Sequence, residues 1–131
     1  MHNVLEKSKV TGMKVELSAY FSGFQQMTIT AEENQASVKC SGRWREGNLD
    51  QEWNWSKDQW KAFLDDLFNL GVAEWKLDYW DNGILDGLQW EVDFSLEDGE
   101  VSEIKGSNDF PRQWDEFLKL LWKHTKVFPL K

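Results

Sequence analysis

Apolar and polar residues alternate along several stretches of the chain, in the pattern of strands that bury one face. Successive side chains of a β-strand point to opposite sides, so every second residue lies on the same face. The first such run covers residues 13–21 and places Phe21 on its apolar side. The same alternation extends over residues 36–40, 75–80 and 88–96. These runs predict half-buried strands, and a further short strand is expected over 27–30.

Turn-forming dipeptides lie beside these runs and predict two hairpins. Asp98-Gly99 follows the last run and predicts a hairpin with a strand near 100–105. Gly47-Asn48 predicts a second hairpin between strands over 36–45 and 49–55. Because hairpins join antiparallel strands, most of the sheet is expected to be antiparallel.

A different pattern occurs twice, at an offset of 54 residues: both 56–68 and 110–122 contain Gln-Trp-x-x-Phe-Leu-x-x-Leu. The apolar positions recur at i, i+3, i+4, i+7 and i+8, which places them on one stripe of an α-helix. Ser56 with Gln59 predicts a capping box, and Gly71 fits a left-handed helix end. Pro111 fits the first position of the second helix.

The order strands, helix, strands, helix predicts an α+β fold. We expect a single, mostly antiparallel sheet with the two amphipathic helices packed on one face. Residues 1–131 then form one domain of two β-hairpin–helix halves, about 13–71 and 72–128, with residues 1–10 frayed. Two separate small subdomains are the alternative, but each would have only one helix and would bury too little area.

Composition agrees with a folded domain. The chain has 131 residues, of which 40% are hydrophobic and 15% aromatic, enough to form a core without a disulfide or a metal. Cys40 is the single cysteine and is expected to be a buried, inert thiol. No run reaches the length of a membrane-spanning helix, and the first ten residues lack the apolar stretch of a secretory signal. The expected location is therefore the cytoplasm, without membrane contact.

The charged residues are distributed unevenly along the chain, and their distribution indicates which kinds of partner the protein can bind. The formal net charge is −8, and residues 46–116 alone carry 19 acidic against 5 basic side chains. Such a segment repels phosphate backbones, which argues against nucleic-acid binding, and attracts a basic protein or a cation. The alternative is a solvated surface that serves solubility only.

Nine tryptophans are the most prominent feature of the composition. Four lie on predicted core stripes or apolar strand faces: Trp60, Trp90, Trp114 and Trp122. Trp53 and Trp55 lie two residues apart on one predicted strand face, and Trp80 ends another predicted strand. Exposed tryptophans of this kind can stack on a sugar ring or anchor a protein partner. The alternative is that Trp53 and Trp55 cover the far face or the edge of the sheet.

Polar residues near these rings are candidates for ligand contacts. Asp81 and Asp86 flank a predicted bend and can bond either ligand hydroxyls or the backbone of a turn. Asn108 lies in a loop, residues 106–111, that is either a plain connection or an anion-binding loop before a helix. Glu91 and Asp93 share a strand face roughly 7 Å apart, a spacing common to alternating strands and therefore weak support for catalysis. No metal-ligand spacing and no cofactor motif is present.

The second half of the chain resembles a known pattern. Asp86-Gly87-x-x-Trp90 followed by Gly106-Ser-Asn-x-Phe-Pro-x-x-Trp114-x-x-Phe117 is similar to a pattern found in small bacterial proteins of uncharacterised function. The resemblance covers roughly residues 75–122 and implies a bacterial, cytosolic α+β domain with no assigned reaction. The first half lacks the Gly-Ser-Asn loop, so the resemblance assigns no site there.

These observations favour a non-enzymatic binding domain whose partner is a basic protein. Neutralisation of such a partner, as an immunity-type protein does with a toxin, is one form that this function can take. The alternative is binding of a carbohydrate or another small molecule through exposed tryptophans and acidic residues. The candidate binding residues are Trp53, Trp55, Trp80, Asp81, Asp86 and Asn108, and the oligomeric state is left open.

Overall fold

One continuous sheet organises the computed structural model, which describes residues 5–81, 83 and 87–131. Within these residues the strands are β1 (Val10–Ala19), β2 (Gly23–Ala31), β3 (Gln35–Trp44), β4 (Gly47–Ser56), β5 (Asp78–Trp80), β6 (Leu88–Leu96) and β7 (Val101–Ser107). The helices are α1 (Lys57–Leu70) and α2 (Trp114–Thr125), with short 3₁₀ turns at Lys7–Lys9 and Val72–Glu74. The expected α+β class is therefore confirmed.

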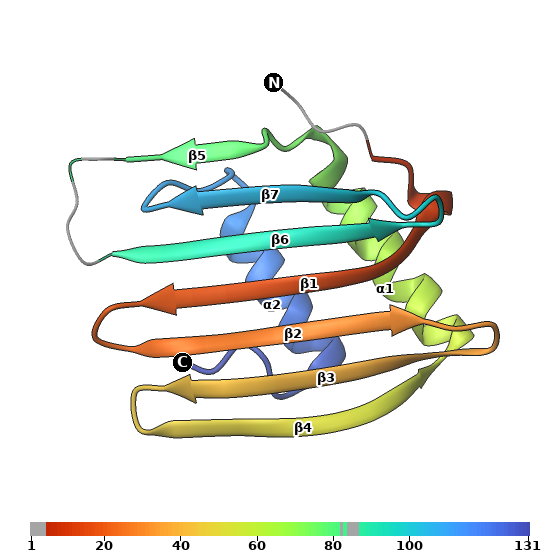
Figure 1. The fold of residues 1–131 in the computed structure, drawn as a ribbon, viewed down its shortest axis with the longest axis horizontal. Helices are drawn as coiled ribbons and strands as arrows, with labels where there is room; N and C mark the ends of the chain where they lie inside the picture. Colours follow the sequence, from red (N-terminus) through yellow and green to blue (C-terminus); the bar gives the residue numbers. More distant parts are fainter. Residues whose placement is uncertain (1–4, 82, 84–86) are drawn as a thin grey trace.

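The seven described strands lie in the order β4-β3-β2-β1-β6-β7-β5 (Figure 1). All neighbouring pairs are antiparallel except β5 and β7, which run parallel. Strand β1 pairs with β2 on one side and with β6 on the other, so it joins the first half of the chain to the second. Each helix follows a hairpin, and both helices lie on the same face of the sheet (Figure 1).

The core lies between that face and the two helices. Every second strand residue points into it, among them Val15, Met27, Val38 and Val92, and all four are buried. The helices contribute Phe63 and other apolar residues of their predicted stripes. Burial of each such side chain stabilises the fold by roughly 1.5–3 kcal/mol. The alternation in the sequence thus follows from packing on one side of the sheet only.

Three strand boundaries differ from the prediction. The strand expected over 27–30 is the longer β2, and the strand expected over 75–80 is reduced to the three residues of β5. Strand β1 ends at Ala19, and the chain then turns, so Phe21 is 79% exposed instead of buried. The turn between β3 and β4 lies at residues 45–46, two residues before the predicted dipeptide Gly47-Asn48. Arg45 adopts a positive φ of 55° there, a conformation that glycine takes more readily.

The start and end of α1 agree with the sequence. Ser56 and Gln59 form the predicted capping box, and Gly71 ends the helix in the left-handed conformation with φ 104°. The start of α2 was predicted wrongly. The chain first makes a turn in which the amide of Trp114 donates to the carbonyl of Pro111 at 3.0 Å, so the helix begins at Trp114. Trp122, expected on the core stripe, is 44% exposed at the outer side of α2.

Aromatic rings pack between α2 and strands β5–β7. The ring of Trp90 lies 4.7 Å from that of Trp114, and the ring of Trp75 lies 5.2 Å from that of Phe117. The indole N–H of Trp90 donates to the carbonyl of Asp109 at 2.9 Å, which satisfies its polar atom inside the core. A Cβ on residue 106 would overlap the Trp90 ring, so only glycine fits there. Trp90 and Trp114 are core residues, as the sequence predicts.

Residues 5–10 pack against the rest of the chain, although a frayed terminus was expected over 1–10. Residues 1–4 of that range lie outside the described residues. Leu5 and Val10 are buried in the core. The amine of Lys7 forms an ion pair of 2.7 Å with Asp65 on α1. The apolar residues at both ends of this segment explain why it packs against the helix side. No helix within the described residues has both the length and the apolar composition needed to cross a membrane.

A buried glutamine holds the C-terminal segment against the helix side of the sheet. The side chain of Gln25 is fully buried on β2. Its Nε2 donates to the carbonyl of Leu130 at 3.0 Å, and its Oε1 accepts from the amide of Leu130 at 2.7 Å. This amide side chain therefore satisfies the backbone of Leu130 as a neighbouring strand would.

Replacement of this glutamine tests the role of the contact. We expect Gln25→Ala to lower the free energy of unfolding by about 2 kcal/mol, because it leaves two backbone groups without partners and opens a cavity. Urea denaturation measures this change. Gln26→Ala is the matched control, since Gln26 points to the other face and makes one long bond of 3.4 Å to Ser41. A loss as large in the control as in Gln25→Ala would contradict the proposed role.

Candidate functional site

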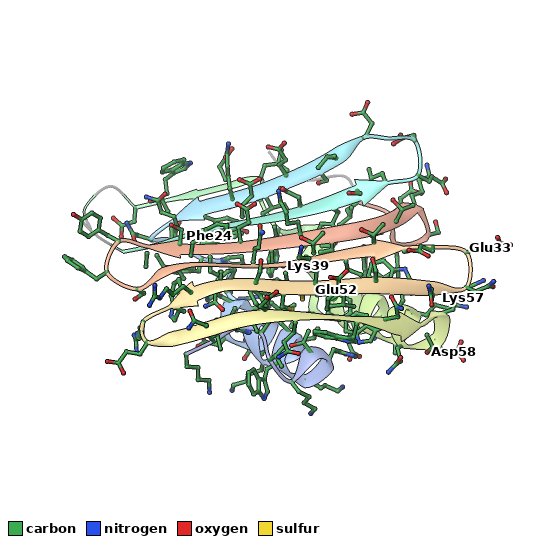
Figure 2. All side chains as sticks on the ribbon, turned by 60° about the horizontal axis from the view of Figure 1, so that its bottom comes forward. Phe24, Glu33, Lys39, Glu52, Lys57 and Asp58 are labelled. Carbon is green, nitrogen blue, oxygen red and sulfur yellow. The ribbon has the colours of Figure 1, made fainter. Side chains whose placement is uncertain are left out.

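Among the described residues, no helix or strand covers the face of the sheet that points away from α1 and α2 (Figure 2). We call it the uncovered face. It is mainly polar, as the strand alternation requires. Seven described strand residues on this face are acidic: Glu16, Asp50, Glu52, Asp78, Glu91, Asp93 and Glu103. Four are basic: Lys14, Lys39, Arg43 and Lys105. This uncovered face therefore carries an excess of negative charge.

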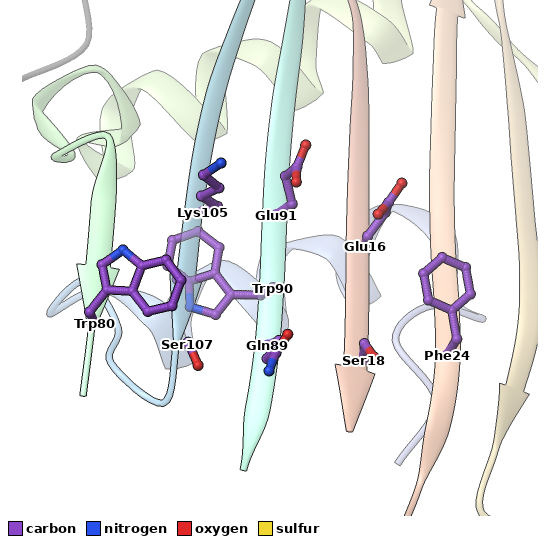
Figure 3. A pocket seen from close by; sticks show the side chains of 10 residues that line it. Glu16, Ser18, Phe24, Trp80, Gln89, Trp90, Glu91, Lys105 and Ser107 are labelled. Carbon is purple, nitrogen blue, oxygen red and sulfur yellow. The ribbon is translucent and has the colours of Figure 1, made fainter. Parts of the chain in front are cut away.

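One row of cross-strand neighbours on the uncovered face has an aromatic ring at each end. The register places Trp80, Ser107, Gln89, Ser18 and Phe24 side by side across β5, β7, β6, β1 and β2. Figure 3 shows the two rings flanking the three small polar side chains. Four strand spacings separate the ends of the row, which is roughly 19 Å.

The aromatic rings at this end of the sheet are exposed. Trp80 is 60% and Phe24 is 43% exposed, and the adjoining β1–β2 turn adds Tyr20 and Phe21 at 77% and 79%. The rings of Tyr20 and Phe21 contact each other edge-on with centroids 4.7 Å apart. Tyr20, Phe21 and Phe24 lie at or beside the β1–β2 turn, and Trp80 lies at the other end of the row on β5. We call these four residues the aromatic patch.

A second row runs beside the first and is charged. Asp78, Lys105, Glu91, Glu16 and Gln26 are cross-strand neighbours, one step further along the same strands. Between the two rows lies a shallow hollow of about 190 Å³, which we call the trough. Its lining combines the Trp80 and Phe24 rings with hydroxyl, amide, carboxylate and ammonium groups (Figure 3).

A third row of cross-strand neighbours, on the far side of the charged row, contains Glu103, Asp93 and Lys14. Asp93 lies there near other carboxylates. Its cross-strand neighbours are Lys14 and Glu103, but the amine of Lys14 forms its ion pair with Glu16, at 3.0 Å. The Oδ1 atom of Asp93 is buried and has no hydrogen-bond partner among the described residues. Burial, a hydrogen bond with Glu91 and the charges of Glu91 and Glu103 raise the pKa of Asp93 to about 7.

The groups that carry nucleophilic or metal chemistry lie elsewhere. Cys40 is buried on the helix side of the sheet, and burial raises the pKa of its thiol to about 12. His124 lies between the helices, where its Nε2 is 2.8 Å from Asp66. Across the described ranges, no three His, Cys, Asp or Glu residues are grouped to hold a metal ion.

The structure does not bring the predicted tryptophans together. Trp53 and Trp55 share a face of β4, but their partners Val38 and Ala36 point to the helices, and so do they. Trp55 is 4% exposed and its ring lies 5.1 Å from that of Phe63. Strand β4 lies at one edge of the sheet, whereas Trp80 lies on β5 at the other. The prediction of a shared site for the three rings is therefore wrong.

The polar candidates have local structural roles. Asp81 is exposed beside Trp80, and its Oδ1 accepts from the amide of Gly83 at 2.9 Å, which closes the predicted turn. Asp86 lies outside the described residues. Asn108 has a positive φ of 60° and its amide donates to the carbonyl of Leu88 at 2.9 Å. Because α2 begins only at Trp114, the loop of Asn108 does not directly precede the helix as an anion site requires.

Sequence reasoning missed Phe24, Glu16 and Lys105 as members of a site. One signal was available for Phe24. Met27 and Ile29 show which face of β2 is apolar. Because every second residue lies on the same face, Gln25 points inward with them and Phe24 points outward. Phe24 and Trp80 share this feature: each is an aromatic residue on the otherwise polar face of its strand. Glu16 and Lys105 carry no comparable signal, because their cross-strand neighbours depend on register.

The pKa of Asp93 predicts how stability depends on pH. An aspartate in the unfolded chain has a pKa near 3.9, so between about pH 4 and pH 7 the folded protein holds a proton that the unfolded chain has lost. The free energy of unfolding should therefore fall as the pH rises through this range. We expect the free energy of unfolding of Asp93→Asn to be about 1 kcal/mol higher than that of the natural chain above pH 7, allowing for solvent screening of this partly exposed carboxyl. Near pH 4 the two free energies should be equal.

Urea denaturation across this pH range checks the expectation. Asp50→Asn, which removes an exposed carboxylate of β4 on the same face, is the matched control and should keep the pH profile of the natural chain. A profile for Asp93→Asn that runs parallel to that of the natural chain would show that Asp93 does not titrate near neutral pH.

Comparison with known proteins identifies no family for this chain. The chain matches no protein-family model, no curated protein and no solved structure. The resemblance of residues 75–122 to small bacterial proteins of uncharacterised function stays a prediction. The function is therefore argued from the geometry of the uncovered face.

Proposed function

We propose that this chain is a non-enzymatic binding domain that takes up a basic protein partner on the uncovered face of its sheet. The observation that carries the proposal is the aromatic patch, which stands beside the carboxylates of Glu16 and Glu91. In a bacterial cytosol, neutralisation of a toxin by an immunity-type protein would be a function of this kind.

The two kinds of group have complementary roles. Aromatic side chains bury large areas and supply much of the binding energy of protein interfaces. Their ring faces also attract arginine and lysine. An acidic surface speeds the approach of a basic partner and disfavours acidic ones. The helix side is different, because most of its aromatic rings are already used in the core.

A capture experiment with lysate proteins tests the proposal. We expect the immobilised chain to retain a protein of high isoelectric point at about 0.15 M salt and less of it at about 0.5 M salt. Removal of two rings, with Phe24→Ala and Trp80→Ala, should lower the amount retained at least about 10-fold.

The control is Trp122→Ala, which removes a partly exposed indole from the helix side. It should retain as much partner as the natural chain does. The proposal fails if the two-ring variant and the control retain equal amounts, or if the retained proteins are not basic.

A saccharide is a second candidate ligand for the same trough. The observation in its favour is the neutral floor of Ser18, Gln89 and Ser107 between two exposed rings. Hydroxyl and amide groups can bond sugar hydroxyls while the rings stack on sugar faces.

Fluorescence titration with linear oligosaccharides distinguishes the two ligands. Saccharide binding should change the tryptophan emission, and Trp80→Phe should abolish that change. Because no charge is involved, the change should be the same at low and high salt. Lack of response to any oligosaccharide removes this candidate and leaves the basic partner.

A further inference from the structure

We infer that the trough receives an extended, cationic segment of the partner, laid across the strands from Trp80 to Phe24. This inference rests on the proposed function and specifies what the uncovered face recognises. It follows from the shape of the trough, the charges beside it and the spacing of its rings.

The shape of the trough favours a thin ligand. Its length is roughly 19 Å, and its volume of about 190 Å³ lies below that of pockets that enclose compact small molecules. A helix is about 10 Å wide with its side chains, which is too wide for such a hollow. An extended chain advances about 3.3 Å per residue, so roughly six steps span the trough.

The charges in the trough favour a cation at one particular place. Glu16 and Glu91 are directly opposed across β1 and β6. Two like charges in this position destabilise the pair of strands. The ion pair of Lys14 with Glu16 offsets this in part, and Lys14 belongs to the third row, outside the trough. An arginine or lysine from a partner can contact both carboxylates and relieve their repulsion.

The spacing of the rings fits alternate residues of the same segment. A cation between β6 and β1 would lie roughly 7 Å from the position of Phe24 and roughly 12 Å from that of Trp80. These distances correspond to about two and four residues along an extended chain. Even-numbered offsets point to the same side of a strand. One segment can therefore direct its cation to the two carboxylates and its other sheet-facing side chains to both rings.

Lys105 limits which residues of the partner segment can lie at the Trp80 end of the trough. Its register neighbours are Glu91 on β6 and Asp78 on β5, and it lines the trough. A second cation placed here would meet an ammonium group. Arg43 on β3 is the register neighbour of Phe24, so a cation at the other end would also meet a like charge. We therefore expect the cationic residue of the segment to lie at the centre, between Glu16 and Glu91.

A defined peptide tests the inference directly. The probe is a fluorescent heptapeptide with arginine at its fifth position, apolar residues at the first and seventh positions that face the rings, and serine elsewhere. It is compared by fluorescence polarisation with the analogue that has glutamate at the fifth position. We expect the arginine peptide to bind and the glutamate peptide not to bind. Glu16→Gln combined with Glu91→Gln should weaken the arginine peptide at least about 10-fold.

The matched control removes the same amount of charge elsewhere. Glu97→Gln with Glu100→Gln changes two exposed carboxylates near the turn between β6 and β7. It should weaken the peptide less than about 2-fold, because the general field of the protein changes equally in both variants. Trp80→Ala and Phe24→Ala should each also weaken the peptide, whereas Trp122→Ala should not.

Several results would overturn the inference. Equal weakening by the two double variants would mean attraction to net charge without a site. Binding of the glutamate peptide, or of oligosaccharides in place of the arginine peptide, would also reject it. If the arginine peptide fails while capture of a basic protein still depends on Phe24 and Trp80, only the extended segment is wrong. If that capture is independent of both rings, the proposed function fails.

Discussion

Packing on one side only is the constraint on which the whole molecule depends. Both helices cover the same face of the sheet, so each strand must supply apolar side chains to one face and polar side chains to the other. The buried apolar side chains of the core lie on the helix side of the sheet. An aromatic ring on the uncovered face therefore has no packing role in the core. This is why the proposed function rests on Trp80 and Phe24 and not on Trp55 and Trp90.

Strand pairing turns scattered residues into a site. Phe24 and Trp80 are far apart in the sequence, and they enter one row only because β1 pairs with both β2 and β6. The members of the trough therefore come from five different strands. The same pairing places Glu16 opposite Glu91, a contact that the sequence alone does not reveal.

The sequence predicted what depends on local pattern and missed what depends on register. Alternation and helical stripes predicted the fold class, and the capping box of α1 and its glycine end were predicted residue by residue. Strand order is set by long-range pairing, for which a single sequence has no periodic signal. That limit explains the error on Trp53 and Trp55. Their shared face was predicted correctly, but whether helices cover that face depends on the assembled sheet.

The uncovered face carries electrostatic strain that the core is able to support. Glu16 faces Glu91, and Asp93 has a buried oxygen without a partner among the described residues. Such groups lower stability, and burial of the apolar side chains on the opposite face offsets the loss. A cationic ligand would act on the same groups, since a positive charge near Asp93 favours its ionised form and lowers its pKa.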